Sequence, residues 1–398
     1  MATVLIASIC GTPVSSCLLG ACIGTLIYQV ITKFKSPMFI SSCGATVSAV
    51  IGALALPSIS GGQNYLMCFI GGIIILAIYG GFALLVKFFG VDVLNKIFPP
   101  TIVGPVTMVI GLNLAGFIPT YTNIGGKHND IAIVVAVATM LVVAIISHYA
   151  KGIWKTIPFL VGLAFGYIVS LILTLTGVCN LVDFSSFQNI TWYPDITFLK
   201  WNAGDFTWGN LGSVALLFIP VAICALLEHY SDHKCLSNII GTDLTKEPGL
   251  HRTLTGDGVA SALGTAICGL PNTSYGESIA TTGFSGVAST YVITLSAIML
   301  GLLSFIGPVQ AFIQSIPSAV FGGCAMILYG YIAASGLKTL INSGVSLEDN
   351  KNLIIVSVIL TVGVSGLFLF SSSFTGVSLA MVSGVILNLI LRPKKEVV

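Results

Sequence analysis

Charged residues are scarce in this 398-residue sequence. Only 8% of its residues are Asp, Glu, Lys or Arg, whereas 55% are hydrophobic, and a soluble domain carries about 25% charged residues. This composition excludes an ordinary soluble protein and predicts an all-α polytopic membrane protein. The formal net charge is only +2, so the sequence offers no strongly basic surface for a nucleic-acid partner.

Metal-binding cysteine motifs and a secretion signal are also missing. The ten cysteines form no C-x-x-C pair, which argues against a zinc site or a disulfide framework and favours buried, inert thiols. Met1 is followed directly by the apolar stretch ATVLIASICG, without the basic n-region of a signal peptide. That stretch is too short to span a bilayer before GTPVSS interrupts it, so the chain is expected to begin within a membrane segment.

Apolar runs recur along the whole chain. A transmembrane helix needs about 20 apolar residues, and the runs predict about 14 membrane elements. This number includes the stub at 2–9 and two short segments rich in Gly, Ser and Pro, near 37–45 and 270–286. The longer runs lie near 15–32, 46–58, 65–89, 98–118, 131–150, 157–177, 212–231, 253–268, 287–307, 319–341, 352–371 and 374–391.

The cations predict how the chain is oriented in the membrane. They fall almost entirely in alternate connections and in the C-terminal tail, which the positive-inside rule places in the cytoplasm. Only Lys127 and Lys200 lie in the other connections. The segment 178–211, which is rich in Trp, is therefore expected outside, resting on the membrane interface. The cytoplasmic set is Lys33, Lys35, Lys87, Lys96, Lys151, Lys155, Lys234, Lys246, Arg252, Lys338, Lys351, Arg392, Lys394 and Lys395.

Two pairs of segments echo one another in the two halves of the chain. FPPTIVGPVTMVIGLNLAG at 98–116 and IPSAVFGGCAMILYGYIAASG at 316–336 share a proline and similarly spaced glycines. SPMFISSCGAT at 36–46 resembles LPNTSYGES at 270–278 more loosely. Interrupted segments at corresponding places of two halves are typical of an inverted-repeat transporter.

Two carboxylates within one apolar run are candidates for function. Glu228 follows SVALLFIPVAICALL and Asp232 lies four residues later, on the same helix face. A charge at mid-bilayer costs about 2.5–3.5 kcal/mol on insertion scales, so such an acid is a functional candidate. Repulsion between two nearby acids favours protonation of one of them, which suits a proton carrier. The alternative for Asp232 is a position at the cytoplasmic end, beside His233 and Lys234.

A third candidate, Glu277, follows a break in the apolar pattern. Pro271 has no N–H, the run 272–275 favours an extended chain, and a short half-helix is expected from Glu277 onward. Free N–H groups at a helix N-terminus can bind a ligand carbonyl, although a capping acid without a ligand is the alternative. Asp257 lies close to Arg252 in the sequence, and we expect a structural ion pair or a cap there.

Three motifs resemble the nucleobase–ascorbate transporter family, also called nucleobase/cation symporter family 2, and its bacterial uracil carriers in particular. They are Glu-His at 228–229, Glu-Pro-Gly-Leu-His-Arg at 247–252 and Pro-Asn-Thr-Ser-Tyr-Gly-Glu at 271–277. They stand in the order and spacing of the family. Further similarity in GTLIYQVITKFKSP, FPPTIVG and LYGYIAASGLKTLI extends the resemblance over almost the whole chain.

The resemblance implies a fold of fourteen segments in two inverted repeats of seven. A core domain would comprise 1–90 and 212–307, and a gate domain 91–211 and 308–398. Short strands in segments three and ten would meet at mid-membrane. The family's first helix starts well before the residue that matches Ala2, so segment one is expected to be truncated here, which could leave the carrier inactive.

The resemblance further implies a proton-coupled symporter that imports uracil across the cytoplasmic membrane by alternating access. It implies no enzymatic activity, no metal and no cofactor other than the proton, and it leaves open a homodimer through the gate domains. The cations of the tail predict a cytoplasmic C-terminus. The substrate-binding residues that it implies are Glu228, Glu277, Gly276, Tyr275, Cys43 and Gly44, and the proton-coupling residues are Glu228, Asp232 and Glu277. Carboxylates would accept from the ring N–H groups, and backbone N–H groups at 276–277 and 43–44 would donate to the carbonyls.

Two departures from the family pattern bear on these roles. Uracil carriers of the family often have histidine where Asp232 stands. The resemblance therefore does not fix the details of the proton relay. A phenylalanine that stacks on the base is often found where this chain has Gly44. The missing ring leaves room for a bicyclic base, so xanthine or urate is the alternative substrate.

Two other classes of protein fit the sequence less well. An anion transporter or channel of the same fold would favour a cation or neutral residue where the two acids stand, because acids repel anions. An intramembrane enzyme would need a nucleophile–base pair or a cluster of metal ligands, and the sequence shows neither.

Overall fold

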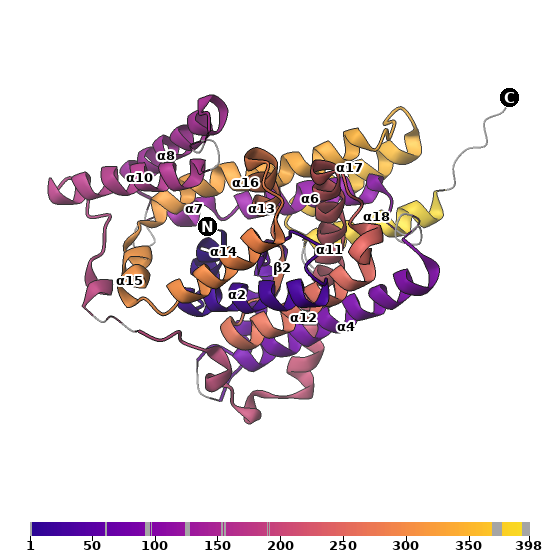
Figure 1. Cartoon of the computed structure of the whole chain (residues 1–398), viewed down its shortest axis with the longest axis horizontal. Coiled ribbons are helices and arrows are strands. Elements are labelled where there is room, and N and C mark those ends of the chain that lie inside the picture. Colours follow the sequence, from indigo (N-terminus) through magenta and orange to yellow (C-terminus); the bar gives the residue numbers. More distant parts are fainter. Residues whose placement is uncertain are drawn as a thin grey trace.

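The computed structural model describes residues 2–59, 62–91, 96, 98–123, 128–152, 154, 157–188, 190, 192–367 and 376–391. This part of the chain is mostly helical (Figure 1). The first half contains α1 (Ala2–Cys10), α2 (Val14–Ile31), α3 (Val47–Leu54), α4 (Tyr65–Phe89), α6 (Pro100–Ala115), α7 (Ile118–Thr122), α8 (Asp130–Tyr149) and α10 (Pro158–Leu175). The second half contains α11 (Trp208–Ile240), α12 (Leu250–Cys268), α13 (Gly276–Ser285), α14 (Thr290–Leu303), α15 (Gly307–Ser315), α16 (Ser318–Asn342), α17 (Asn350–Val364) and α18 (Gly376–Ile390).

Seven described helices are long and apolar enough to cross a membrane, and an eighth span results if α14 and α15 are counted together across their 88° bend. The chain is therefore a multi-pass membrane protein, as its composition predicts. Shorter apolar helices include Asn350–Val364 and Leu379–Ile390, which fall below the usual length of a span. The number fourteen stays a prediction. The seven are Val14–Ile31, Tyr65–Phe89, Pro100–Thr122, Asp130–Tyr149, Pro158–Leu175, Trp208–Ile240 and Ser318–Asn342.

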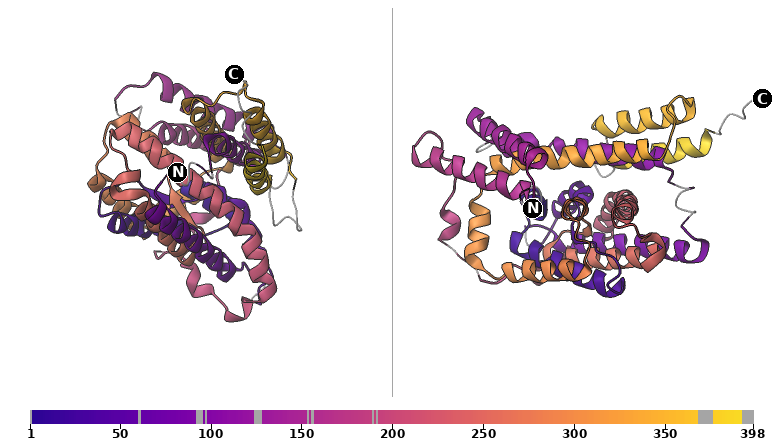
Figure 2. Two further views of the ribbon diagram at one scale, coloured as in Figure 1. Left: turned by 90° about the vertical axis from the view of Figure 1, so that its right-hand side faces the viewer. Right: turned by 45° about the horizontal axis from the view of Figure 1, so that its top comes forward.

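The helices form two packed groups. Helices α2, α4, α12 and α14 pack on one another, and a second group is formed by α6, α8, α10, α16, α17 and α18. The right-hand view of Figure 2 shows the groups as two layers. Helix α11 crosses between them and packs against α4 in the first layer and against α6 and α18 in the second. The arrangement places the middle of α11 at the junction of the layers.

Two three-residue strands pair in the middle of the first layer. β1 (Ile40–Ser42) and β2 (Asn272–Ser274) are antiparallel, with Ile40 opposite Ser274 and Ser42 opposite Asn272. Helix α12 ends at Gly269 in the left-handed conformation, at φ 73°, and Pro271 cannot donate a backbone hydrogen bond. The local sequence therefore stops the helix and leaves the chain extended.

Neighbouring helices complete the hydrogen bonding of the strands. The Thr25 hydroxyl donates to the carbonyl of Ile40 at 2.8 Å and accepts from its N–H at 3.0 Å. The Ser261 hydroxyl of α12 donates to the backbone carbonyl of Asn272, and the Asn272 side chain donates to the carbonyls of Gly20, at 2.9 Å, and Ala260, at 3.3 Å. Because buried backbone groups must be paired, these contacts from α2 and α12 allow an interrupted backbone inside the protein.

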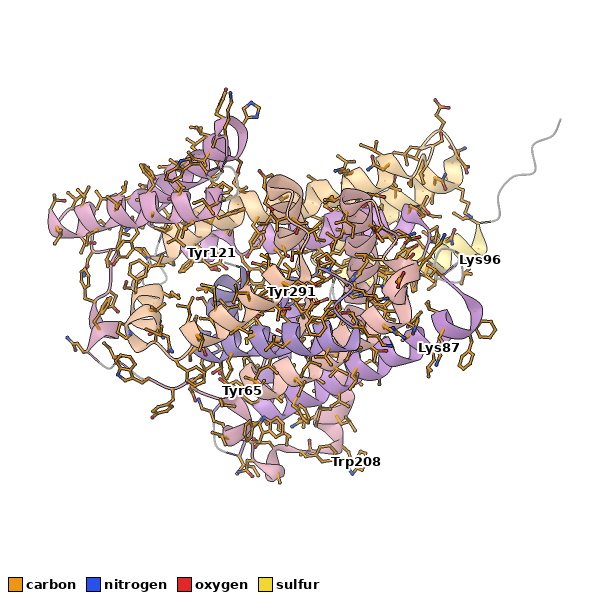
Figure 3. The ribbon with its side chains drawn as sticks, viewed as in Figure 1. Tyr65, Lys87, Lys96, Tyr121, Trp208 and Tyr291 are labelled. Atoms are coloured by element: carbon orange, nitrogen blue, oxygen red, sulfur yellow. The ribbon has the colours of Figure 1, made fainter. Side chains whose placement is uncertain are left out.

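Outward-facing surfaces of the helices remain apolar. Helix α10 exposes bulky aliphatic side chains along its length, and Tyr291 at the start of α14 is 82% exposed. A soluble surface would not present such rows, whereas lipid covers them. Figure 3 labels Lys87 and Lys96 on the right-hand side of the view and Trp208 at the lower edge. The exposed aliphatic residues of α10 are Leu160, Ile168, Ile172 and Leu175.

Two predicted segments differ from the observed helices. The run expected at 212–231 is part of α11, which continues to Ile240 and ends at Gly241 in the left-handed conformation. Asp232 thus lies in the interior of a helix, and the alternative of a position at the cytoplasmic end of the membrane segment stays open. The run expected at 287–307 ends at Leu303, where the chain turns into α15.

Candidate functional site

The site lies where α11 passes the strand pair. Helix α11 packs against β2, against α13, and against the short helix η1 (Gly44–Thr46) that follows β1. These elements come from distant parts of the chain, and both interruptions of the apolar pattern meet on one helix. The geometry brings together the predicted residues of α11, β1 and the segment after β2.

Glu228 and Asp232 lie on this stretch of α11. Glu228 is half-buried, and its Oε2 atom has no hydrogen-bond partner within the described residues. Asp232 is also half-buried and accepts from the hydroxyl of Ser274 on β2 at 2.6 Å. One acid of the pair is thus held by the strand, while the other keeps an acceptor oxygen without a partner in this part of the chain.

The N-terminus of α13 supplies backbone donors. Tyr275 is extended and caps the helix, which begins at Gly276. The first N–H groups of a helix have no intrahelical partner. The N–H groups of Gly276 and Glu277 are therefore available to a ligand. The Tyr275 ring lies 6.2 Å from that of Phe39, centroid to centroid. The backbone of Glu277 lies in α13, whereas its side chain lies outside the described part.

At the end of β1 the structure differs from the expected pattern of donors. The N–H of Cys43 donates to the carbonyl of Pro271 at 2.9 Å, so the pairing of the strands already uses it. The predicted donation from the Cys43 N–H to a base would compete with this hydrogen bond. At Gly44, an added Cβ would meet only Leu114 Cδ1 at 3.6 Å and Ile6 Cδ1 at 4.0 Å, which are ordinary contact distances.

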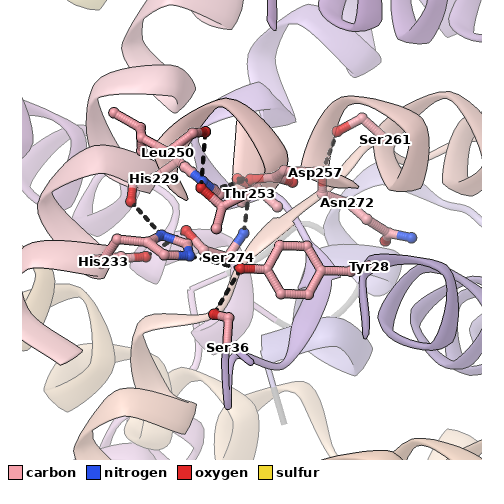
Figure 4. A network of polar contacts seen from close by, with 12 residues as sticks. Tyr28, Ser36, His229, His233, Leu250, Thr253, Asp257, Ser261, Asn272 and Ser274 are labelled. Carbon is pink, nitrogen blue, oxygen red and sulfur yellow. Dashed lines mark hydrogen bonds and ion pairs between the residues drawn. The ribbon is translucent and has the colours of Figure 1, made fainter. Parts of the chain in front are cut away.

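Asp257 forms a structural ion pair, as expected, but its partner is His229 and not the neighbouring Arg252. It is fully buried, and its Oδ2 atom pairs with Nδ1 of His229 at 2.5 Å. The same oxygen accepts from the Thr273 hydroxyl at 3.0 Å and from the Ser274 N–H at 3.3 Å. Asp257 therefore joins α11, α12 and β2 (Figure 4). The sequence pointed to the nearest cation along the chain, but the fold supplies a histidine from another helix.

A second histidine on α11 extends the polar cluster toward α2. His233 is fully buried; its Nδ1 atom lies 2.8 Å from the carbonyl of His229, and its Nε2 atom lies 2.7 Å from the Tyr28 hydroxyl. The Tyr28 hydroxyl also lies 2.9 Å from that of Ser36, in the connection before β1. The two imidazole rings lie 4.0 Å apart. Buried polar groups thus link both interrupted segments to α11.

Outside the membrane-spanning segments, one ion pair joins the connections that flank the site. Lys35, before β1, donates to Glu247 in η5 (Thr245–Gly249). This hydrogen bond lowers the pKa of the Glu247 carboxyl. Both side chains are half-exposed or more, so the pair is screened by solvent and contributes little to stability.

A metal centre finds no support in the geometry. In the part of the chain that the structure describes, no group of three or more His, Cys, Asp or Glu side chains could hold a metal ion. The site instead combines carboxylates, backbone donors and aromatic rings, which suit an uncharged polar ligand.

Comparison with known proteins decides the family. A family model described as "Permease family" matches residues 1–372. This chain belongs to the nucleobase–ascorbate transporter family. The family and the relatives are permeases, so this nucleobase–ascorbate transporter is not an enzyme.

Curated relatives match this nucleobase–ascorbate transporter over nearly its whole length. The uracil permease of Bacillus caldolyticus is 37% identical over 99% of this chain and 90% of its own. The uracil permease of Bacillus subtilis is 36% identical over the same shares. The uracil permease of Escherichia coli is 33% identical over 94% of this chain and 86% of its own.

Solved structures establish the fold. The transmembrane domain of BicA, a cyanobacterium bicarbonate transporter, superposes with a TM-score of 0.68, at 14% identity, over 96% of this chain and 93% of that one. The structure of SLC26A9 also gives 0.68, at 13% identity, over 98% of this chain and 62% of that one. At this level of identity the likeness concerns the fold alone.

Sequence reasoning missed two residues of the site and misjudged a third. His229 appeared only as part of a motif and His233 only as a neighbour of Asp232, whereas both are buried. Their spacing of four residues places them on one face of α11, beside the face of the two acids. The acids and the histidines thus form two pairs with the same four-residue spacing, and this pattern could have indicated the histidines from the sequence.

Proposed function

We propose that this transporter imports uracil across the cytoplasmic membrane together with a proton. The observation that carries the proposal is Glu228, a half-buried acid within a membrane helix whose Oε2 atom has no partner in the described chain. A carboxylate in this environment is costly and marks a substrate or proton path. The three related uracil permeases support the choice of base.

The chemistry of uracil matches the groups around Glu228. Its ring carries N–H donors and carbonyl acceptors, and a carboxylate accepts from the N–H groups. Backbone N–H groups at the start of α13, at Gly276 and Glu277, have no intrahelical partner and can donate to a carbonyl. We assign the Glu277 carboxylate a second contact with the base, as the family motif implies.

Proton coupling is assigned to Glu228 and Asp232, with Glu277. Asp232 accepts from Ser274 on β2, so its protonation state acts on the strand that leads into α13. Two carboxylates on one helix face are not easily ionised together. A base that donates hydrogen bonds to Glu228 requires the ionised form, and this requirement links substrate binding to proton movement.

Transport follows from movement of the first layer of helices against the second. We assign the layers to the core and gate domains of a fold of fourteen segments in two inverted repeats, with the strands at mid-membrane. Their relative movement opens the site to each side in turn. The tail, which lies outside the described residues, is placed in the cytoplasm by its cations, and a homodimer would form through the gate domains.

The test is uptake of radiolabelled uracil by liposomes that contain the purified protein, with and without an inward proton gradient. We expect the gradient to accelerate uptake and an excess of unlabelled uracil to block it. Gradient-driven uptake of xanthine in place of uracil would overturn the assignment of the substrate. Equal uptake with and without the gradient would overturn proton coupling.

Gly44 gives a test of selectivity for the base. An added Cβ at this position would make only ordinary contacts, and the absence of a larger side chain at Gly44 makes xanthine the second candidate substrate. We expect Gly44→Phe to weaken competition by xanthine at least about tenfold, because a bicyclic base needs more room. Competition by unlabelled uracil should change less, as measured from inhibition curves in the same liposomes. An equal loss for both bases would show that the position does not select between them.

A further inference from the structure

Helix α11 presents two different polar faces at the site. Glu228 and Asp232 are four residues apart on one face, and His229 and His233 are four apart on the adjacent face. Asp232 contacts β2 through Ser274. His229 contacts Asp257 of α12, and His233 contacts Tyr28 of α2. The histidine face therefore fixes the rotation of α11 against its neighbours, and this rotation determines where Glu228 points.

A single oxygen is the centre of these contacts. The Oδ2 atom of Asp257 accepts from the His229 ring, the Thr273 hydroxyl and the Ser274 N–H. Ser274 is thus held by Asp257 through its N–H and by Asp232 through its hydroxyl. Two residues later the chain enters α13. A shift of this oxygen would move the strand and the backbone donors that follow it.

The second histidine orders the hydrogen bonds on the α2 side. A backbone carbonyl can only accept, so Nδ1 of His233 must carry the proton that it gives to the carbonyl of His229. In the neutral ring, Nε2 then accepts from the Tyr28 hydroxyl, whose oxygen accepts from Ser36. The series ends on a carbonyl, which cannot pass a proton onward. These contacts hold position and do not form a continuous proton path to Asp257.

We propose that His229 is a positioning residue, which acts through Asp257 to hold β2 and the start of α13 against Glu228. The requirement is geometric: His229 must donate from the Nδ1 position, and residue 257 must offer one acceptor oxygen. The proposal rests on the proposed function, because the site that His229 positions is the nucleobase site. It assigns a role to a residue that does not touch the base.

Three substitutions at His229 separate this role from mere filling of space. Asn carries its amide N–H near the position of Nδ1, Gln carries it near Nε2, and Leu has no donor. We expect His229→Asn to keep the KM for uracil within about threefold, while His229→Gln and His229→Leu raise it about tenfold or more, since the buried oxygen of Asp257 loses a donor.

A second measurement does not depend on uracil. A hydrophobic carbodiimide labels buried carboxyl groups, and its rate of reaction at Glu228 is followed by peptide mass spectrometry. We expect this rate in His229→Asn to match the unmodified protein and that in His229→Gln to differ by at least about threefold, because the surroundings of Glu228 change. If His229→Leu does not fold, the comparison of His229→Asn with His229→Gln still tests the positioning role.

The outcomes separate the two proposals. Equal KM values and equal labelling in the Asn and Gln variants would overturn the positioning role. Different labelling in a protein that transports no nucleobase would support the positioning role and remove the proposed function. A threefold or smaller effect of Gln on KM, together with unchanged labelling, would assign His229 to packing alone.

Discussion

Replacing Glu228 with Gln is expected to abolish proton-driven uptake of uracil, with initial rates reduced about 100-fold or more. The amide keeps the size of the side chain but cannot bind and release a proton, and it offers one acceptor where the carboxylate offers two. Its NH₂ group would also face the N–H donors of the base, and an unpaired buried donor costs about 1–3 kcal/mol. The measurement is the initial rate in liposomes under an inward proton gradient.

The matched control is Glu348→Gln, in the exposed connection before α17. This change removes the same charge from a residue far from the strand pair in the sequence, and uptake should stay within about twofold, as for surface substitutions generally. Uptake near that of the unmodified protein in Glu228→Gln would contradict the role of this acid in coupling. If Glu228→Gln altered an ion conductance of the protein without abolishing it, the protein would be a channel.

Gly336→Ala is expected to destabilise the protein strongly. Helices α6 and α16 cross so closely that a Cβ on Gly336 would lie 2.5 Å from the carbonyl oxygen of Gly104 and 2.5 Å from the N atom of Met108. Backbone atoms cannot rotate away as a side chain can, so the helices must separate. Overpacking costs about 1–3 kcal/mol of unfolding free energy, and we expect the melting temperature in detergent to fall by at least about 3 °C.

Gly330→Ala, on the same helix, is the control for Gly336→Ala. A Cβ on Gly330 meets nothing within 4 Å, and alanine favours a helix over glycine by about 1 kcal/mol. The melting temperature should therefore stay the same or rise slightly. An equal fall for both variants would show that the close crossing of α6 with α16 is not the cause of the destabilisation by Gly336→Ala.

The two echoes in the sequence correspond to two contacts in the structure. The segments at 98–116 and 316–336 contain the crossing of α6 with α16, and Gly104 and Gly336 approach one another there. The looser pair, at 36–46 and 270–278, contains β1 and β2, which pair with each other. The sequence could show that these segments resemble one another, because composition is local. It could not show that they touch.

The interruption of the helical pattern at 270–276 could also be predicted from local chemistry. Gly269 takes a left-handed conformation, Pro271 lacks an N–H, and α13 begins one residue earlier than Glu277. The length of α11 was harder to predict, because the charged and polar residues after Glu228 suggested that the helix ends there. In its last turns, Leu236 and Ile240 pack in one cluster with Ile40 of β1 and Ala260 of α12, and a helix that is stabilised by tertiary contacts need not follow its local pattern.

The sequence by itself determined that this is a membrane protein, where its backbone is interrupted, and which acid, Glu228, lies within an apolar run. These properties depend on residues close together in the chain, on apolarity and on proline and glycine. Only the tertiary structure decided that Asp257 pairs with His229 and that Ser274 contacts both Asp257 and Asp232. Such partners are set by how helices rotate and cross, and no short stretch of sequence contains that information.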